Sequence, residues 1–113
     1  MKHNSIYLKH ILDEIDFIIS QTGNLTYDSL GENELYTRAF SRSMEIIGEA
    51  VKNLSQDFKD KHNNIEWKKI SGMRDKIIHH YFNVDYDLIW DVIKNKLPGI
   101  KKKIQKVLET ENT

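Results

Sequence analysis

The sequence predicts an all-α protein, a bundle of four to five helices in one domain over residues 1–113. Three observations lead to this fold class. The chain contains one proline and five glycines, too few for the frequent turns of an all-β fold. Apolar residues recur at helical spacing along most of its length. A chain of 113 residues is also the usual size of one domain with its own core.

The first half of the chain predicts two helices separated by a loop. A first helix is expected from about Ser5 to Gln21, and Thr22 to Gly31, with two glycines, is expected to be a loop. A second, longest helix is expected from about Glu32 to Leu54. Gly48 lies inside this helix and weakens it by about 1 kcal/mol relative to alanine. We therefore expect another helix to approach its backbone closely at Gly48.

A polar connection and a third helix are predicted next along the chain. The polar segment Ser55 to Asn64 is expected to connect the second helix to a third, which spans about Glu66 to Tyr81. Trp67, at core spacing in this helix, is interpreted as a packing residue rather than as a platform for base stacking.

The last part of the chain predicts one or two further helices. Asp85 is expected to cap a fourth helix that begins near Tyr86, because its carboxylate can accept a free backbone N–H of the first turn. Pro98 interrupts the apolar pattern, so it either kinks this helix or starts a new one over Pro98 to Glu109. Trp90 is also interpreted as a packing residue.

Composition excludes several classes of site. The chain has no cysteine, which excludes disulfides, thiolate metal sites and a cysteine nucleophile. Met1 to His10 has no apolar run of signal-peptide length, and no run of about 18 apolar residues occurs. We expect a cytoplasmic protein with no membrane partner and no cofactor.

Charge is balanced overall but unevenly distributed. The chain has 17 basic and 17 acidic residues, yet eight acids and two bases lie between Ile11 and Ala50, and six lysines and no acid lie between Lys94 and Lys106. This basic strip is typical of a solvated helix face, and contact with an RNA backbone is the alternative.

The segment from Met73 to Phe82 groups an arginine, two histidines and a tyrosine. Cleavage of RNA without a metal requires a base for the 2′-hydroxyl, an acid for the leaving 5′-oxygen and a cation for the phosphorane. His79 can move protons at neutral pH, and Arg74 offers a bidentate fork for phosphate. A structural Arg–Asp–His network that includes Asp75 remains an alternative.

Helical geometry keeps the two predicted catalytic residues apart. Arg74 and His79 are about 140° apart around an ideal helix, whereas Arg74 and Tyr81 share a face. The simplest remedy is a cleft lined from two sides by two copies of the same helix, related by a two-fold axis.

Four ordered blocks of the sequence resemble the HepT family of the HEPN superfamily. Arg74-x-x-x-x-His79-x-Tyr81 matches the family's R-x-x-x-x-H-x-Y motif. The stretches Arg42 to Ala50 and Ile65 to Arg74 are similar to its long helix and to its lead-in to the motif, and Tyr86 to Trp90 followed by Leu97-Pro98 is similar to its closing segment.

The resemblance implies a homodimeric HEPN-type bundle that cuts RNA, such as tRNA or mRNA, without a metal. It assigns Arg74 and His79 as catalytic residues, with Asp75 and His80 supporting them. It also implies a toxin–antitoxin pair, in which a minimal nucleotidyltransferase transfers AMP onto Tyr81. Many relatives carry asparagine in place of Asp75 and glycine in place of His80. A non-catalytic accessory subunit of such a nucleotidyltransferase is the alternative function.

Two further groupings have structural interpretations. His62 with His79 and His80 resembles a zinc site, but adjacent histidines point to different faces of a helix, so no metal site is expected. Glu45 and Glu49 are spaced like a carboxylate pair, but ion pairing of these acids with Arg42 is the favoured interpretation.

Overall fold

The computed structural model of the chain describes residues 2–77 and 85–111, with only the backbone described at positions 2, 3 and 77. The described residues contain helices and no strand, which confirms the predicted all-α class. In chain order the elements are α1 (Lys2–Thr22), α2 (Tyr27–Glu32), α3 (Glu34–Asn53), α4 (Gln56–Lys61), α5 (Trp67–Ile77), α6 (Tyr86–Asp91), the π-helical turn η1 (Val92–Lys96) and α7 (Leu97–Glu111).

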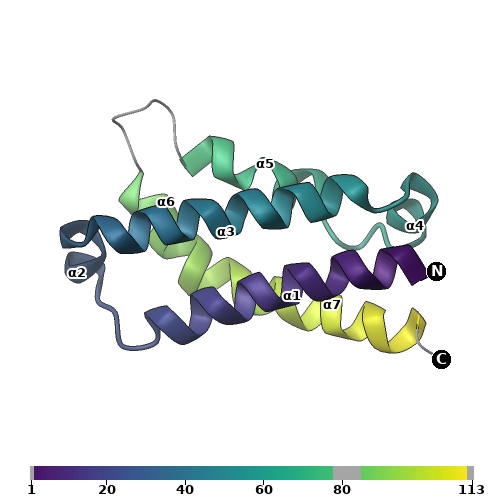
Figure 1. Cartoon of the computed structure of the whole chain (residues 1–113), viewed down its shortest axis with the longest axis horizontal. Coiled ribbons are helices and arrows are strands. Elements are labelled where there is room, and N and C mark those ends of the chain that lie inside the picture. The colour runs from purple at the N-terminus through teal and green to yellow at the C-terminus, as the bar shows by residue number, and fades with distance from the viewer. Residues whose placement is uncertain (1, 78–84, 112–113) are drawn as a thin grey trace.

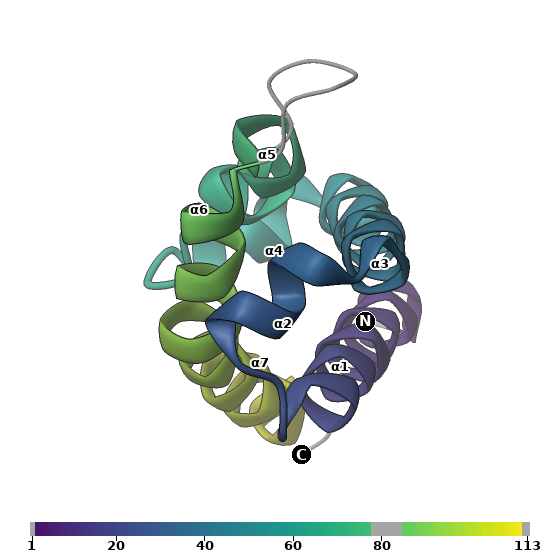
Figure 2. The same ribbon diagram turned by 90° about the vertical axis from the view of Figure 1, so that its left-hand side faces the viewer.

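The long helices run side by side along the 44 Å axis of the molecule. α1 packs against α3 on one side and α7 on the other, and α3 in turn packs against α5 (Figure 1). Viewed end-on, these helices surround the interior, and α2 crosses the near end of the bundle, where it contacts α3 and α6 (Figure 2). The predicted helical bundle is therefore confirmed.

Two short helices replace the predicted loop and connection. α2 begins after Thr26, whose side chain accepts a hydrogen bond from the backbone N–H of Ser29 in a capping box. α4 begins after Ser55, which caps the backbone N–H of Phe58. Each helix buries one large side chain, Leu30 in α2 and Phe58 in α4. The prediction of a loop and a polar connection was wrong at these positions, because capped helices of six residues are too short to show helical periodicity.

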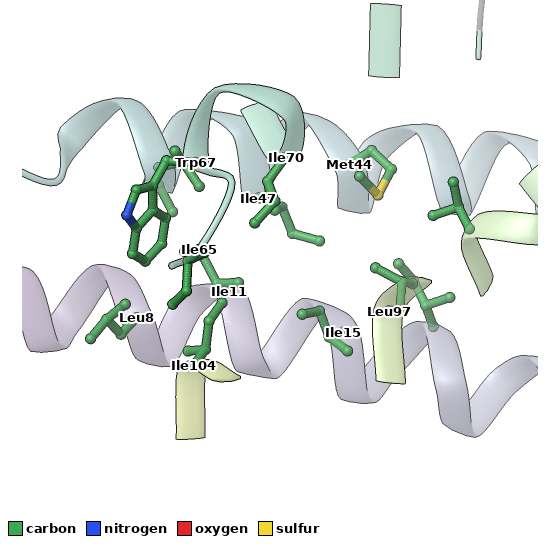
Figure 3. Close-up of a cluster of buried hydrophobic side chains, with 14 of the residues drawn as sticks. Leu8, Ile11, Ile15, Met44, Ile47, Ile65, Trp67, Ile70, Leu97 and Ile104 are labelled. Atoms are coloured by element: carbon green, nitrogen blue, oxygen red, sulfur yellow. The ribbon is translucent and has the colours of Figure 1, made fainter. Parts of the chain in front are cut away.

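The interior is filled by branched aliphatic side chains from all the long helices (Figure 3). Leu8, Ile11 and Ile15 of α1 meet the inward residues of α3, α5 and α7. Trp67 is 6% exposed and donates from Nε1 to the carbonyl of His62, which confirms its packing role. Among the described residues, no helix combines the length and apolarity needed to cross a membrane.

The joint between η1 and α7 explains how the chain accommodates its only proline. Asp85 caps α6 by accepting a hydrogen bond from the backbone N–H of Leu88, as predicted. After α6 the helix widens into η1, where the N–H of Leu97 bonds to the carbonyl of Val92, five residues back. Pro98 then lies in the first turn of α7, where its missing N–H costs little.

α5 approaches the backbone of α3 closely at Gly48. This glycine is buried, and a Cβ built on it would lie 3.2 Å from the carbonyl oxygen of Ser71 in α5. The predicted close approach of a second helix at this position is confirmed. The contact holds α5, and with it Arg74, against the C-terminal half of α3.

Replacing Gly48 with leucine should force α3 and α5 apart. We expect Gly48→Leu to lower the free energy of unfolding by at least about 2 kcal/mol in urea denaturation, because the new side chain meets backbone that cannot rotate away. Gly72→Leu is the matched control, since a Cβ at Gly72 meets no atom within 4 Å. Its stability should stay the same or rise by up to about 1 kcal/mol. Equal effects of the two substitutions would contradict the packing argument.

Candidate active site

The predicted site residues begin at the end of α5. Arg74 and Asp75 lie in the last turn of this helix. His79, His80 and Tyr81 lie outside the described residues, so their predicted roles stay predictions.

Arg74 is positioned by a rigid helix but is held loosely at its charged end. Its side chain is 41% exposed, and its guanidinium lies 3.5 Å from Glu45 through Nε and 3.5 Å from Asp75 through Nη1. Both distances exceed the 2.7–2.9 Å typical of charge-assisted hydrogen bonds. The Nε atom is buried and has no hydrogen-bond partner among the described residues. The Nη donors of this partly exposed guanidinium have only the long contact to Asp75 among the described residues, so they remain available for an oxyanion.

Glu45 of α3 links two arginines. Its carboxylate lies 3.6 Å from Nη1 of Arg42 on its own helix and 3.5 Å from Nε of Arg74 on α5. The predicted pairing of Glu45 with Arg42 is confirmed. Its contact with Arg74 was not predicted, because no spacing rule relates residues on two helices that meet only after folding.

A surface pocket of about 490 Å³ lies beside these charges, between α1, α3 and α5. Arg42 and Arg74 line it together with the carboxylates of Glu45, Glu49 and Asp75. Tyr7 and His10 of α1 also line it. No local sequence pattern relates Tyr7 or His10 to the motif, because their helix lies far from it along the chain. The pocket thus combines two arginines and Lys52 with a phenol and an imidazole.

The exposure of this group bears on the alternative of a structural network. The side chain of Asp75 is 82% exposed, and that of Glu45 is 40% exposed. Ion pairs in such wet surroundings contribute about 0–1 kcal/mol to stability. Arg74 and Asp75 therefore do not form a buried pair, and His79, the third member of that alternative, lies outside the described residues.

His62, considered above as a metal ligand, contacts an acid and an aromatic ring instead. Its Nε2 lies 3.1 Å from Glu111 of α7, and its ring packs against Phe58 with the centroids 4.7 Å apart. Lys61 shares the same carboxylate, and hydrogen bonds from both residues lower the pKa of Glu111. Within residues 2–77 and 85–111, no group of three potential ligands could hold a metal ion.

Comparison with known proteins identifies the family. The family described as "Ribonuclease HepT-like" matches residues 11–107. The chain belongs to this ribonuclease family. The match includes the whole Arg74 to Tyr81 motif and all of α3 and α5.

Two relatives of this HepT-like chain match it along nearly their full length. A protein of Caldanaerobacter subterraneus subsp. tengcongensis named "Putative RNase" is 45% identical, over 98% of this chain and 99% of its own. "Probable ribonuclease HepT" of Thermococcus cleftensis is 38% identical, over 89% of this chain and 92% of its own. No solved structure matches the chain.

Removing the Arg74 side chain should leave the HepT-like fold intact. We expect Arg74→Ala to change the free energy of unfolding by no more than about 1 kcal/mol, because both of its ion pairs are solvent-exposed. Urea denaturation followed by circular dichroism measures this. Ile70→Ala, a buried position on the same helix, is the control and should cost about 2–5 kcal/mol. A comparable loss for Arg74→Ala would indicate a structural role.

Proposed function

We propose that this chain is a metal-independent ribonuclease, the toxin of a cytoplasmic toxin–antitoxin pair, with Arg74 and His79 as its catalytic residues. The observation that carries the proposal is the state of Arg74 in a member of a ribonuclease family. Its guanidinium lines a pocket, is partly exposed, and makes only long contacts to carboxylates. A cation kept open in this way suits a phosphate ligand.

The proposed reaction needs one proton carrier and one fixed cation. His79 takes the proton of the RNA 2′-hydroxyl as its oxygen attacks the neighbouring phosphorus, and a proton is returned to the 5′-oxygen as its bond to phosphorus breaks. Arg74 holds the non-bridging oxygens, whose negative charge grows in the phosphorane. Asp75 lies 3.5 Å from Arg74 and is proposed to orient it, with His80 as a second supporting residue.

A homodimer is the proposed functional form. Because Arg74 and His79 point about 140° apart on an ideal helix, one helix does not bring both to the same phosphate. Two copies of the Arg74 to Tyr81 motif facing each other across a two-fold axis would pair Arg74 of each subunit with His79 of its partner copy.

Mixed dimers test both the catalytic roles and this pairing. Purified wild-type protein should cut RNA in the presence of EDTA, whereas Arg74→Ala and His79→Ala should each lose at least about a hundredfold in rate. Co-expression of the two variants creates mixed dimers with one intact Arg74–His79 pair if the cleft is shared. We expect these mixed dimers to recover part of the wild-type rate of RNA cleavage.

The control is each variant co-expressed with an inactive copy that carries both substitutions, which has no intact pair to restore. No cleavage by wild type, or cleavage that disappears with EDTA, would overturn the proposal. Activity of wild type without recovery in mixed dimers would overturn only the shared cleft.

Regulation is proposed to act on Tyr81. A minimal nucleotidyltransferase antitoxin would transfer AMP from ATP to the tyrosine oxygen, with release of pyrophosphate. On an ideal helix Tyr81 would share the face of Arg74, so the added phosphodiester would bring negative charge and bulk to where the RNA phosphate is proposed to bind.

Co-expression with the partner should therefore increase the intact mass of the chain by one to several AMP units and abolish RNA cleavage. The matched control is Tyr81→Phe, which should keep its mass, because it lacks the acceptor oxygen. An adduct of equal mass on Tyr81→Phe would contradict the mechanism, and so would wild type that is silenced without an adduct.

The second candidate function is a non-catalytic accessory subunit that binds and regulates the nucleotidyltransferase. The observation that favours it is the exposed carboxylate of Asp75 beside Arg74, which competes with an RNA phosphate for the guanidinium. Wild type that binds the partner but leaves RNA intact in the EDTA experiment would support this function.

A further inference from the structure

A second groove lies on the side of α5 that faces α7. Its volume is about 440 Å³, within the range of ligand-binding pockets. Residues from α5, α6, η1 and α7 form its walls. We call it the α5–α7 groove. It is distinct from the pocket that contains Arg74, which opens between α1, α3 and α5.

The α5–α7 groove is strongly basic although the chain is neutral overall. Lys69, Lys76, Lys96 and Lys103 line it, and Glu66 is its only acidic lining residue among the described part of the chain. Lys96 and Lys103 are exposed, and no ion pair or hydrogen bond to them occurs among the described residues. By contrast, Lys94 donates to the carbonyl of Thr22 and Lys101 pairs with Asp16. The basic strip predicted from sequence is thus divided by the fold.

Three cations of the groove act on one acid in its lining, Glu66. Its carboxylate lies 2.8 Å from Nζ of Lys69. The hydrogen bond and charge of Lys69, followed by the charges of Lys103 and Lys96, lower the pKa of Glu66. Lysines from three elements therefore lie close enough to one exposed carboxylate to stabilise its negative charge. An anion that enters the groove would meet the same three ammonium groups.

The floor of the groove is apolar. Ile70 and Met73 of α5 form it together with Leu88 and Ile100. A free phosphate would leave such a floor uncovered. A nucleic acid strand with unstacked bases supplies both parts, because its phosphates match the lysines and the face of a base covers apolar surface. A duplex keeps its bases stacked inside and offers mainly phosphates.

We propose that the α5–α7 groove binds a single-stranded segment of RNA outside the scissile nucleotide, with its phosphates on Lys69, Lys96 and Lys103 and a base on Met73 and Ile100. This inference rests on the proposed ribonuclease function and adds a subsite to it. The groove and the Arg74 pocket are joined by a third hollow across the exposed side of α5. That hollow shares Lys69 and Lys76 with the groove and Ser71 with the Arg74 pocket.

The test measures binding of a fluorescent single-stranded 2′-O-methyl oligonucleotide to the full chain by anisotropy. Such RNA lacks the attacking 2′-hydroxyl, so binding is read independently of cleavage. The double variant Lys96→Gln/Lys103→Gln removes two groove lysines. Lys102→Gln/Lys106→Gln is the matched control, since both are exposed lysines of α7, the helix that carries Lys103, and do not line the groove.

Loss of two phosphate contacts should weaken binding on the order of tenfold near 0.1 M salt. Each phosphate contact to a single strand contributes about 0.7 to the slope of log K against log salt concentration, so loss of two contacts should reduce the magnitude of this slope by about 1.4. The control pair should leave both values near those of wild type. Glu66→Gln should tighten binding, because it removes the carboxylate that competes for the three lysines.

Equal weakening by the two double variants would overturn the subsite, because it would show attraction by net charge alone. Absence of oligonucleotide binding by wild type would also overturn it. A duplex competitor that displaces the oligonucleotide at equal concentration would overturn the preference for single strands. Wild type that binds in this way but leaves ordinary RNA intact would retain the subsite while refuting the ribonuclease proposal, so the two failures are distinguishable.

Discussion

The contact between α3 and α5 at Gly48 is the constraint on which the rest of the structure depends. Because Gly48 has no side chain, the backbone of Ser71 can pack so closely that a Cβ at position 48 would lie only 3.2 Å from its carbonyl oxygen. α5 is short and has one turn after Ser71 before its charged end, so a shift of the helix axis would move Arg74 relative to Glu45 and the pocket. Helix propensity is given up at Gly48, and the close packing that it permits fixes the base of the site.

Rigid backbone and loose side-chain contacts occur together at Arg74. Ile70, one turn earlier on α5, is buried in the core, while the guanidinium of Arg74 reaches carboxylates at distances too long for strong hydrogen bonds. A tight salt bridge there would satisfy the arginine and exclude a phosphate. The arrangement therefore orients the cation without neutralising it. This is the electrostatic requirement for a group that must bind charge appearing in a transition state.

Helical periodicity, capping chemistry and the position of single glycines and prolines predicted the long helices, the cap at Asp85, a kink or new helix at Pro98 and the close approach at Gly48, because each signal comes from residues near one another in sequence. α2 and α4 were missed since six residues carry too little periodicity. The motif identified Arg74 and Asp75, but their neighbours Tyr7, His10 and Glu45 come together only through packing of three helices. No local pattern in the sequence specifies that packing.

Charge segregation in this neutral chain follows from the same packing. α5 separates two kinds of surface: a pocket in which two arginines and one lysine meet three carboxylates, and a groove in which four lysines meet one. In the first, balanced charge holds an arginine ready but limits nonspecific attraction of phosphate. In the second, excess positive charge attracts a polyanion without specifying its position. Net charge alone hides this division, because the acids of α1 and α3 cancel the lysines of η1 and α7 in the sum. The spatial arrangement of the charges, rather than their total, determines what the surface can bind.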